Sequence, residues 1–454
     1  MKRETLIFRL GAGDRTKIYS EPSTQVTEIE LLDINGNLQF GIGDTIISMQ
    51  QTGLEVSAPG ADLLLLASAV YCADKRLSRT EISQDGWTRE IDIHLPVSQP
   101  DVWNPVRSKL EKMLGFLTGD LWRFSFRSQV NPVKEMTEQT TPLVELNPAG
   151  LCLFSGGLDS FIGAVDELEE GRNPLLISHG WVASDSSHQS DCLTALRKEY
   201  GDDRVRQIRS RIGFGEHDVK ITTEGENTER SRSFLFFAIA SAAASGLHNQ
   251  VFTTVPENGL ISLNIPLDSL RLGAFSTRTT HPYFVARFNE LLAAIGIPTQ
   301  LVNPYRYKTK GEMVAECRNQ HLLQTMVDHT ISCSSASKAR WQGKAPGHCG
   351  HCVPCLIRRA ALQSLGIPDP TIYTVGTLAG ANHPSTQAEG EHIRSFQLAI
   401  YRLNKNPKSA PFLVQRAGPL SDYPGELGAF GAMYSRGLGE VERLLHGVRA
   451  SPHV

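Results

Sequence analysis

The chain has 454 residues, 40% of them hydrophobic, and 45 Lys and Arg against 48 Asp and Glu give a net charge of −3. This balance excludes bulk disorder, which needs low apolar content or high net charge, and it argues against a strongly basic nucleic-acid binder. The longest apolar run, residues 234–247, is shorter than the about 20 residues of a membrane span, and the N-terminus lacks the apolar core of a signal peptide. We therefore expect a cytoplasmic protein with no membrane partner.

The first part of the chain, residues 1–128, predicts a small α+β domain because short strand-like and helix-like runs alternate. Asn35-Gly36 is a strong turn signal. No catalytic constellation is evident in this part, which favours a packing or interaction domain. Residues 129–147 have little periodicity and predict a linker. The expected strands are 5–8, 26–32, 90–95 and 122–126, and the expected helices are 61–73 and 106–117.

A second domain, residues 148–365, follows a different pattern of strand, glycine turn, helix and strand. Such alternation predicts an α/β fold, a parallel sheet with helices on both faces, and ligands in such sheets bind at the carboxyl ends of the strands. The expected strands are 151–154, 175–177, 205–208 and 251–255, and the expected helices are 159–170 and 234–247.

The last part, residues 366–454, predicts a partly helical C-terminal extension. Apolar side chains recur there at spacings typical of one face of a helix, and a final helix is expected over residues 440–448. The recurring residues are Ile393, Phe396, Ile400 and Leu403.

The most informative motif is a Ser-Gly-Gly turn that joins the strand at 151–154 to the helix at 159–170. Glycines let the backbone approach a ligand closely, and the free N–H groups of a helix start attract anions. The motif is neither a Walker A loop nor a dinucleotide-binding turn. A plain strand–helix connection is the alternative interpretation. The residues of the motif are Ser155, Gly156, Gly157, Leu158, Asp159 and Ser160.

Half of the eight cysteines form a second motif. Cys349, Cys352 and Cys355 have C-x₂-C-x₂-C spacing, and Cys333 precedes them. Four thiolates at this spacing favour a closed, structural Zn²⁺ site, with an iron–sulfur cluster or a redox pair as alternatives. The other four cysteines are expected in the core. They are Cys72, Cys152, Cys192 and Cys317.

The Ser-Gly-Gly motif resembles the loop of the PP-loop ATP pyrophosphatases, which have an adenine nucleotide alpha hydrolase-like fold. Together with the later cysteines, which Arg358 follows, it resembles the QueC-like 7-cyano-7-deazaguanine synthase family over residues 150–365. Two weaker matches are the Arg-containing stretch 230–234 and the segment 303–312.

The resemblance implies that residues 155–160 bind the pyrophosphate end of ATP, with Mg²⁺ bridging the phosphates. It places His179 near the adenosine, although a lone histidine is more often structural. Arg278 is a further cation that could counter phosphate or carboxylate charge. The residues that the resemblance assigns to catalysis are Asp159, Ser160, Arg232 and Lys310.

The chain departs from the usual family member in its length and in an insertion at residues 264–280. These departures resemble the longer branch of anti-phage defence systems, the Qat type (QatC), and a related type in cyclic-nucleotide signalling operons. The resemblance implies ATP-dependent adenylation of a 7-carboxy-7-deazaguanine-like carboxylate, with release of AMP and pyrophosphate and amide formation with an amine. That amine could belong to a protein partner of the same defence system. The chain could also form a homodimer.

Two other functions remain open at this point. One is a PP-loop enzyme that modifies tRNA, either a thiolase or a lysidine-type synthetase, although the acidic net charge argues against a nucleic-acid partner. The other is a zinc-bearing scaffold that binds a nucleotide without turnover.

Overall fold

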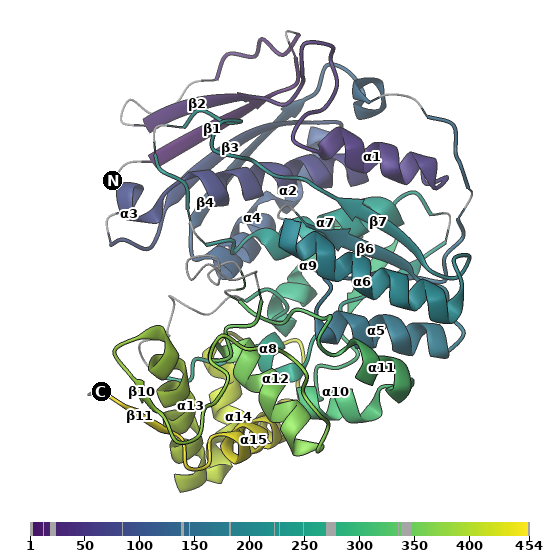
Figure 1. Ribbon diagram of the computed structural model, residues 1–454. Coiled ribbons are helices and arrows are strands. Elements are labelled where there is room, and N and C mark those ends of the chain that lie inside the picture. The colour runs from purple at the N-terminus through teal and green to yellow at the C-terminus, as the bar shows by residue number, and fades with distance from the viewer. Residues whose placement is uncertain are drawn as a thin grey trace.

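The N-terminal part of the chain forms a four-stranded sheet that rests on helices (Figure 1). The computed structural model describes residues 3–11, 13–18, 24–83, 85–137, 140–144, 146–180, 183–221, 223–226, 228–247, 249–268, 278–334, 336 and 347–452. The elements of this part are β1 (Arg3–Arg9), β2 (Thr24–Glu30), α1 (Ile42–Gln51), α2 (Ala58–Arg76), α3 (Arg79–Ile82), β3 (Glu90–Val97), α4 (Pro100–Thr118), β4 (Leu121–Ser128) and the 3₁₀ helix η1 (Val133–Met136).

The order of this sheet is β2-β1-β3-β4, and every pairing between its strands is parallel. The expected α+β topology is therefore wrong for this part, because all strand pairs are parallel and helices separate β2 from β3 and β3 from β4, as in an α/β unit. The expected strands and helices are present. Asn35-Gly36 forms the predicted turn, closed by an antiparallel bridge between Leu32 and Leu38.

The central sheet has five parallel strands in the order β7-β6-β5-β8-β9. The predicted parallel α/β sheet is thus confirmed. Its elements are β5 (Leu151–Leu153), α5 (Leu158–Glu169), β6 (Leu175–His179), α6 (Ala183–Tyr200), β7 (Arg206–Ser210), α7 (Arg232–Ala244), β8 (Val251–Thr254), α8 (Gly259–Leu263), α9 (Pro282–Ala294), β9 (Thr299–Val302), α10 (Lys310–Glu316), α11 (Gln320–Met326) and α12 (Val353–Ser364).

Helices cover both faces of the central sheet. Successive side chains of β5 point to opposite sides: Leu151 and Leu153 join the core formed by α7, α9 and the N-terminal helices, whereas Cys152 joins the core beneath α5 and α6. The N-terminal unit thus shares a continuous hydrophobic core with one face of the central sheet. Helix α2, almost entirely buried, is the element between them, and it packs along α7.

A buried ion network reinforces this junction. The Arg89 guanidinium donates to Asp74 Oδ1 at 2.6 Å and to Asp120 Oδ2 at 2.8 Å, and all three side chains are at most 1% exposed. The second oxygen of Asp74 accepts hydrogen bonds from the backbone N–H and the hydroxyl of Ser231, at 2.8 and 2.9 Å. The network therefore joins α2 to the residue that immediately precedes α7.

The C-terminal part packs against the central domain through α8 and α12 (Figure 1, green to yellow). The four periodic apolar residues predicted to share one helix face are all buried along α13. The elements of this part are β10 (Asn382–Pro384), α13 (Ala388–Lys405), η4 (Pro407–Ser409), α14 (Ala410–Leu413), η5 (Val414–Arg416), α15 (Leu427–Leu444) and β11 (Arg449–Ser451).

The prediction for the last helix was wrong in its bounds. Helix α15 starts at Leu427, well before residue 440, and ends at Leu444. Glycines disfavour a helix locally, but two glycines of α15 are needed where this helix packs closely against its neighbours. A Cβ on Gly437 would lie 2.5 Å from Leu260 Cδ1, and one on Gly431 would lie 2.9 Å from the nitrogen of Pro411.

Two further expectations can be compared with the structure. The four scattered cysteines are all buried, as predicted. In the described part of the chain, the helices are either too short or too polar to span a bilayer.

Replacing Arg89 with Met should lower the free energy of unfolding by about 3–5 kcal/mol, because Asp74 and Asp120 would each lose one of two buried arginine partners and would keep only Arg79. Denaturant unfolding followed by fluorescence measures the change. The matched control is Arg123→Met. Arg123, 49% exposed, pairs with Asp92 at 2.7 Å on the sheet surface, and such surface pairs contribute about 0–1 kcal/mol. Equal losses in the two variants would contradict the assigned role of the buried network.

Candidate functional site

The Ser-Gly-Gly turn connects β5 to α5 at the carboxyl edge of the central sheet. The predicted strand–turn–helix arrangement is therefore confirmed. Within the turn, the Ser155 and Ser160 hydroxyls are 3.2 Å apart, and Ser160 Oγ donates to the carbonyl of Gly157 at 2.9 Å. Gly157 is the N-cap of α5 and supplies no side-chain acceptor for the first-turn N–H groups. These groups remain available to an anion, as is usual at phosphate-binding helix starts.

Both glycines of the turn are required by close backbone contacts. Gly156 has a φ of +80°, a conformation that favours glycine, and a Cβ there would lie 3.0 Å from the backbone nitrogen of Gln189 on α6. A Cβ on Gly157 would lie 3.0 Å from the carbonyl oxygen of Ile331. The N–H of Ile331 in turn donates to the Gly156 carbonyl at 3.0 Å. The turn is thus held between α6 and the segment that leads to Cys333.

Asp159, in the first turn of α5, forms a buried ion pair with Lys310, the first residue of α10. Its other carboxylate oxygen accepts hydrogen bonds from the backbone and side-chain nitrogens of Asn258, at 3.1 and 2.7 Å. Asn258 is the N-cap of α8. All three side chains are less than a tenth exposed. The structure therefore brings Asp159 and Lys310, two predicted catalytic residues, into direct contact.

A second carboxylate, Glu257, lies next to this pair. Burial raises the pKa of Glu257 well above its ordinary value, and the negative charge of Asp159 raises it further. Burial would also raise the pKa of Asp159, but the Lys310 ammonium and the hydrogen bonds outweigh this effect, so that pKa is lowered. Asp159 therefore carries the charge, and a bound cation would favour ionisation of Glu257 as well.

His179 and Arg232 lie together at the end of β6. The His179 ring is only 2% exposed, and its Nε2 lies 2.9 Å from the Ile212 carbonyl oxygen. The His179 carbonyl oxygen accepts hydrogen bonds from Arg232 Nη2 at 3.4 Å and from Gln189 Nε2 at 3.2 Å. The ring thus belongs to the core, and contact between His179 and an adenosine stays a prediction.

Arg278 lies against the N-terminal unit. Its guanidinium stacks 4.6 Å from the centre of the Phe116 ring and donates to the Phe116 carbonyl at 2.8 Å. Most of the insertion predicted at 264–280 lies outside the described residues, which omit 269–277.

Sequence reasoning missed three residues at the site: Glu257, Asn258 and Gln189. A signal existed for two of them, because Glu257 and Asn258 follow β8, the strand that pairs with β5. Polar residues after neighbouring parallel strands meet at the same edge of the sheet. Gln189 had no comparable signal, since its position depends on how α6 packs against the turn.

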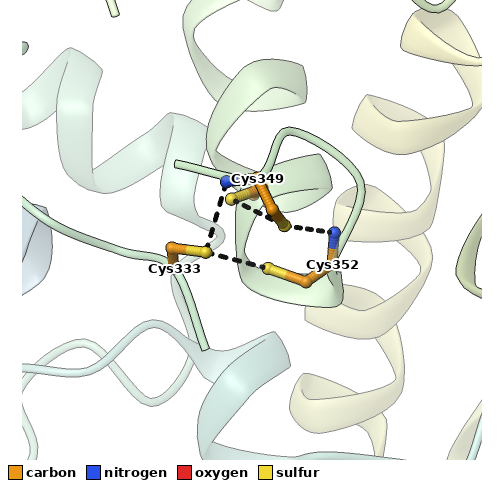
Figure 2. A group of neighbouring side chains, drawn as sticks. Cys333, Cys349 and Cys352 are labelled. Atoms are coloured by element: carbon orange, nitrogen blue, oxygen red, sulfur yellow. Dashed lines mark hydrogen bonds between the residues drawn. The ribbon is translucent and has the colours of Figure 1, made fainter. Parts of the chain in front are cut away.

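The four cysteines predicted as metal ligands form one cluster. Their sulfur atoms all lie within 4.8 Å of one another. Figure 2 shows the side chains of Cys333, Cys349 and Cys352 pointing toward a common centre. The Cys333–Cys352 and Cys349–Cys355 sulfur pairs are each 3.9 Å apart, and tetrahedral zinc with Zn–S bonds of about 2.3 Å requires about 3.8 Å. The donor set therefore fits zinc.

The cysteine cluster and the Ser-Gly-Gly turn are linked by the short segment 330–333. Arg358, fully buried on α12, donates to the Thr330 hydroxyl at 2.8 Å and lies 3.4 Å from the Ser332 hydroxyl. Ile331 bonds to Gly156, and Cys333 is a member of the cluster. A metal bound to the cluster would therefore hold in place the segment 330–333, which packs against one side of the Ser-Gly-Gly turn.

No protein-family model matches the chain. It is similar, however, to proteins named 7-cyano-7-deazaguanine synthase. The one from Methanothrix thermoacetophila is 25% identical over 244 residues, which span 49% of this chain and 97% of that protein. The one from Methanococcus maripaludis strain C7 is 25% identical over 254 residues, 50% of this chain and 98% of that protein. These matches support a 7-cyano-7-deazaguanine synthase-like unit in about half of the chain.

Metal analysis of the purified protein should give about one zinc per chain, and Cys352→Ala should lose it, because a structural zinc site needs all four ligands. Cys72→Ala, which changes a buried cysteine outside the cluster, is the matched control and should retain the zinc. Iron with visible absorbance, or an unchanged metal content in Cys352→Ala, would contradict the assignment.

Proposed function

We propose that this chain activates a carboxylate like that of 7-carboxy-7-deazaguanine by adenylation. A carboxylate oxygen attacks the α-phosphorus of ATP, the bond to pyrophosphate breaks, and an acyl-adenylate forms. An amine then attacks the acyl carbon, which yields an amide and releases AMP. The similarity to 7-cyano-7-deazaguanine synthases and the arrangement of the carboxyl edge support this reaction.

The observation that carries the proposal is the Asp159–Lys310 pair beside the Ser-Gly-Gly turn. A buried lysine beside a helix start whose N-cap supplies no side-chain acceptor is suited to a ligand of high negative charge, such as the phosphates of ATP. Catalysis of adenylyl transfer depends mainly on positioning and on stabilising the charge that develops on the departing pyrophosphate. We assign the donors for this charge to the turn and to Lys310.

Arg232 is the cation that we assign to the carboxylate substrate or to the α-phosphate. Its side chain is 37% exposed, so its charge is accessible, while its contacts with Glu229 at 3.6 Å and with the His179 carbonyl fix it near the end of β6. An accessible arginine at the carboxyl edge can pair with a planar carboxylate.

Two metal ions fit the residues present. Mg²⁺ would be held by Asp159 and Glu257, whose oxygens are the ligands this ion prefers, and it would neutralise phosphate charge. Burial, and after it the negative charge of Asp159, raises the pKa of Glu257, and a divalent cation would offset both effects. Zn²⁺ at the four cysteines would have no open position for a substrate, so we assign it a structural role.

We further propose that the amine belongs to a protein partner within a cytoplasmic anti-phage defence system of the Qat type. The motivation is that the relatives match only about half of this chain. We assign recruitment of that partner to the N-terminal unit, which lies outside residues 150–365, and the product would be a deazaguanine–protein amide.

Incubation of the protein with 7-carboxy-7-deazaguanine, Mg²⁺ and ATP should release AMP and pyrophosphate in a carboxylate-dependent manner. AMP formed only when tRNA is added would favour a tRNA-modifying enzyme, and no AMP under either condition would refute adenylation. Intact mass measurement of co-expressed neighbouring proteins tests conjugation, because the acceptor should gain the mass of the acyl group.

Asp159→Asn should lower the rate of AMP formation by roughly 10²–10³-fold, because it removes the carboxylate that pairs with Lys310 and that we assign to Mg²⁺, and both cations stabilise phosphate charge. Ser155→Ala should also lower that rate. Ser155 is exposed, so its replacement should leave the melting temperature unchanged. Asp203→Asn is the matched control, because Asp203 is 99% exposed. Normal activity in both site variants would contradict the assignment of the turn.

A further inference from the structure

The partners of Asp159 come from the starts of two short helices. Asn258 caps α8 and Lys310 opens α10. Neither helix exceeds seven residues, and isolated helices this short are unstable in water. Packing against other parts of the chain must therefore hold both helix starts in place.

Helix α15 contacts the start of α10 through polar side chains. Glu440, 7% exposed, accepts a hydrogen bond from the Thr309 hydroxyl and another from the Gly311 N–H at 3.3 Å. Thr309 and Gly311 directly flank Lys310. A Cβ on Gly311 would lie 2.5 Å from Glu440 Oε1, so a side chain at this position would displace the Glu440 carboxylate.

A second contact between α15 and α10 lies one turn earlier. Arg436 Nε donates to Glu312 Oε1 at 2.5 Å, and Arg436 Nη2 donates to the Tyr307 carbonyl at 2.9 Å. Glu312 is also the partner of Thr309 in the capping box of α10. Residues four apart lie on the same helix face, so Arg436 and Glu440 act on α10 together.

The same helix also packs against the start of α8. A Cβ on Gly437 would lie 2.5 Å from Leu260 Cδ1, and one on Gly259 would lie 2.6 Å from Met433 Cε. Gly259 directly follows Asn258. One helix of the C-terminal part thus contacts both elements that supply the partners of Asp159.

We infer that α15 is a positioning element of the nucleotide site, in which Glu440 holds the start of α10 so that Lys310 meets Asp159. The inference rests on the proposed function only in assigning ATP to this site. Glu440 touches neither Asp159 nor the turn, so it acts through Thr309 and Gly311. The C-terminal part then belongs to the ATP-binding unit and is more than an appended domain.

The test is Glu440→Gln. The side-chain NH₂ of the glutamine would face a hydrogen-bond donor, either the Gly311 N–H or the Thr309 hydroxyl, so one of the two hydrogen bonds would be lost. We expect Mg–ATP affinity, measured by calorimetry on the full chain, to fall roughly fivefold to tenfold, which is within the range for loss of one typical intramolecular hydrogen bond. Glu442→Gln is the matched control on the same helix. Glu442 is exposed and bonds only to Asn404 among its described contacts, at 2.8 Å, so affinity should stay within about twofold.

A double-mutant cycle separates positioning from general packing. On a Lys310→Met background, Glu440→Gln should cause less than about a twofold further loss of Mg–ATP affinity, because its effect passes through Lys310. A full additional loss on that background, or equal affinities in Glu440→Gln and wild type, would overturn the inference.

If Glu440→Gln or Lys310→Met lowers the melting temperature, a loss of affinity could come from partial unfolding. Arg436→Gln is then the variant that tests the inference. Arg436 is 47% exposed, so its replacement should fold normally and lower Mg–ATP affinity about threefold. Unchanged affinity for Mg–ATP in Arg436→Gln would overturn the inference.

This test is independent of the proposed reaction, because Mg–ATP binding is measured without a carboxylate substrate. Absence of AMP formation in the wild type would refute the proposed function, but the affinity measurements would still test the role of α15.

Discussion

The buried ion pair between Asp159 and Lys310 is the constraint on which the arrangement of this site depends. Removing two charges from water costs several kcal/mol per ion, and their attraction offsets this cost only when the geometry is good and the remaining acceptors are satisfied. Asn258 supplies the additional donors. The pair therefore forms only if the starts of α8 and α10 are both fixed, and the packing of α15 against them provides that fixation.

The N-terminal unit is connected to the same edge of the sheet by a different route. Asp74 accepts two hydrogen bonds from Ser231, and the next residue, Arg232, contacts the end of β6. Because Asp74 is also held by the buried Arg89, one buried polar network joins α2 to the start of α7. Both ends of the chain thus contribute to the geometry of a site whose motif residues lie in the middle.

The sequence predicted the features that local patterns determine. The Ser-Gly-Gly turn and the C-x₂-C-x₂-C run have fixed local spacing, and the structure places both as expected. The parallel N-terminal sheet was missed because strand direction depends on long-range connections. The start of α15 was missed because its glycines, which serve packing against residues such as Leu260, resemble helix breakers. Glu257 was missed because its importance arises only beside Asp159, and Glu440 because its partners lie on a distant helix.

The central claim is that ATP transfers its adenylyl group to a carboxylate at this site. Exchange of labelled pyrophosphate into ATP, measured with 7-carboxy-7-deazaguanine and Mg²⁺ but without an amine, tests it most directly. Reversible adenylation predicts that label enters ATP only when the carboxylate is present, and that Lys310→Met abolishes the exchange. Formation of ADP and phosphate without exchange would show that the carboxylate is phosphorylated instead, and would contradict the claim.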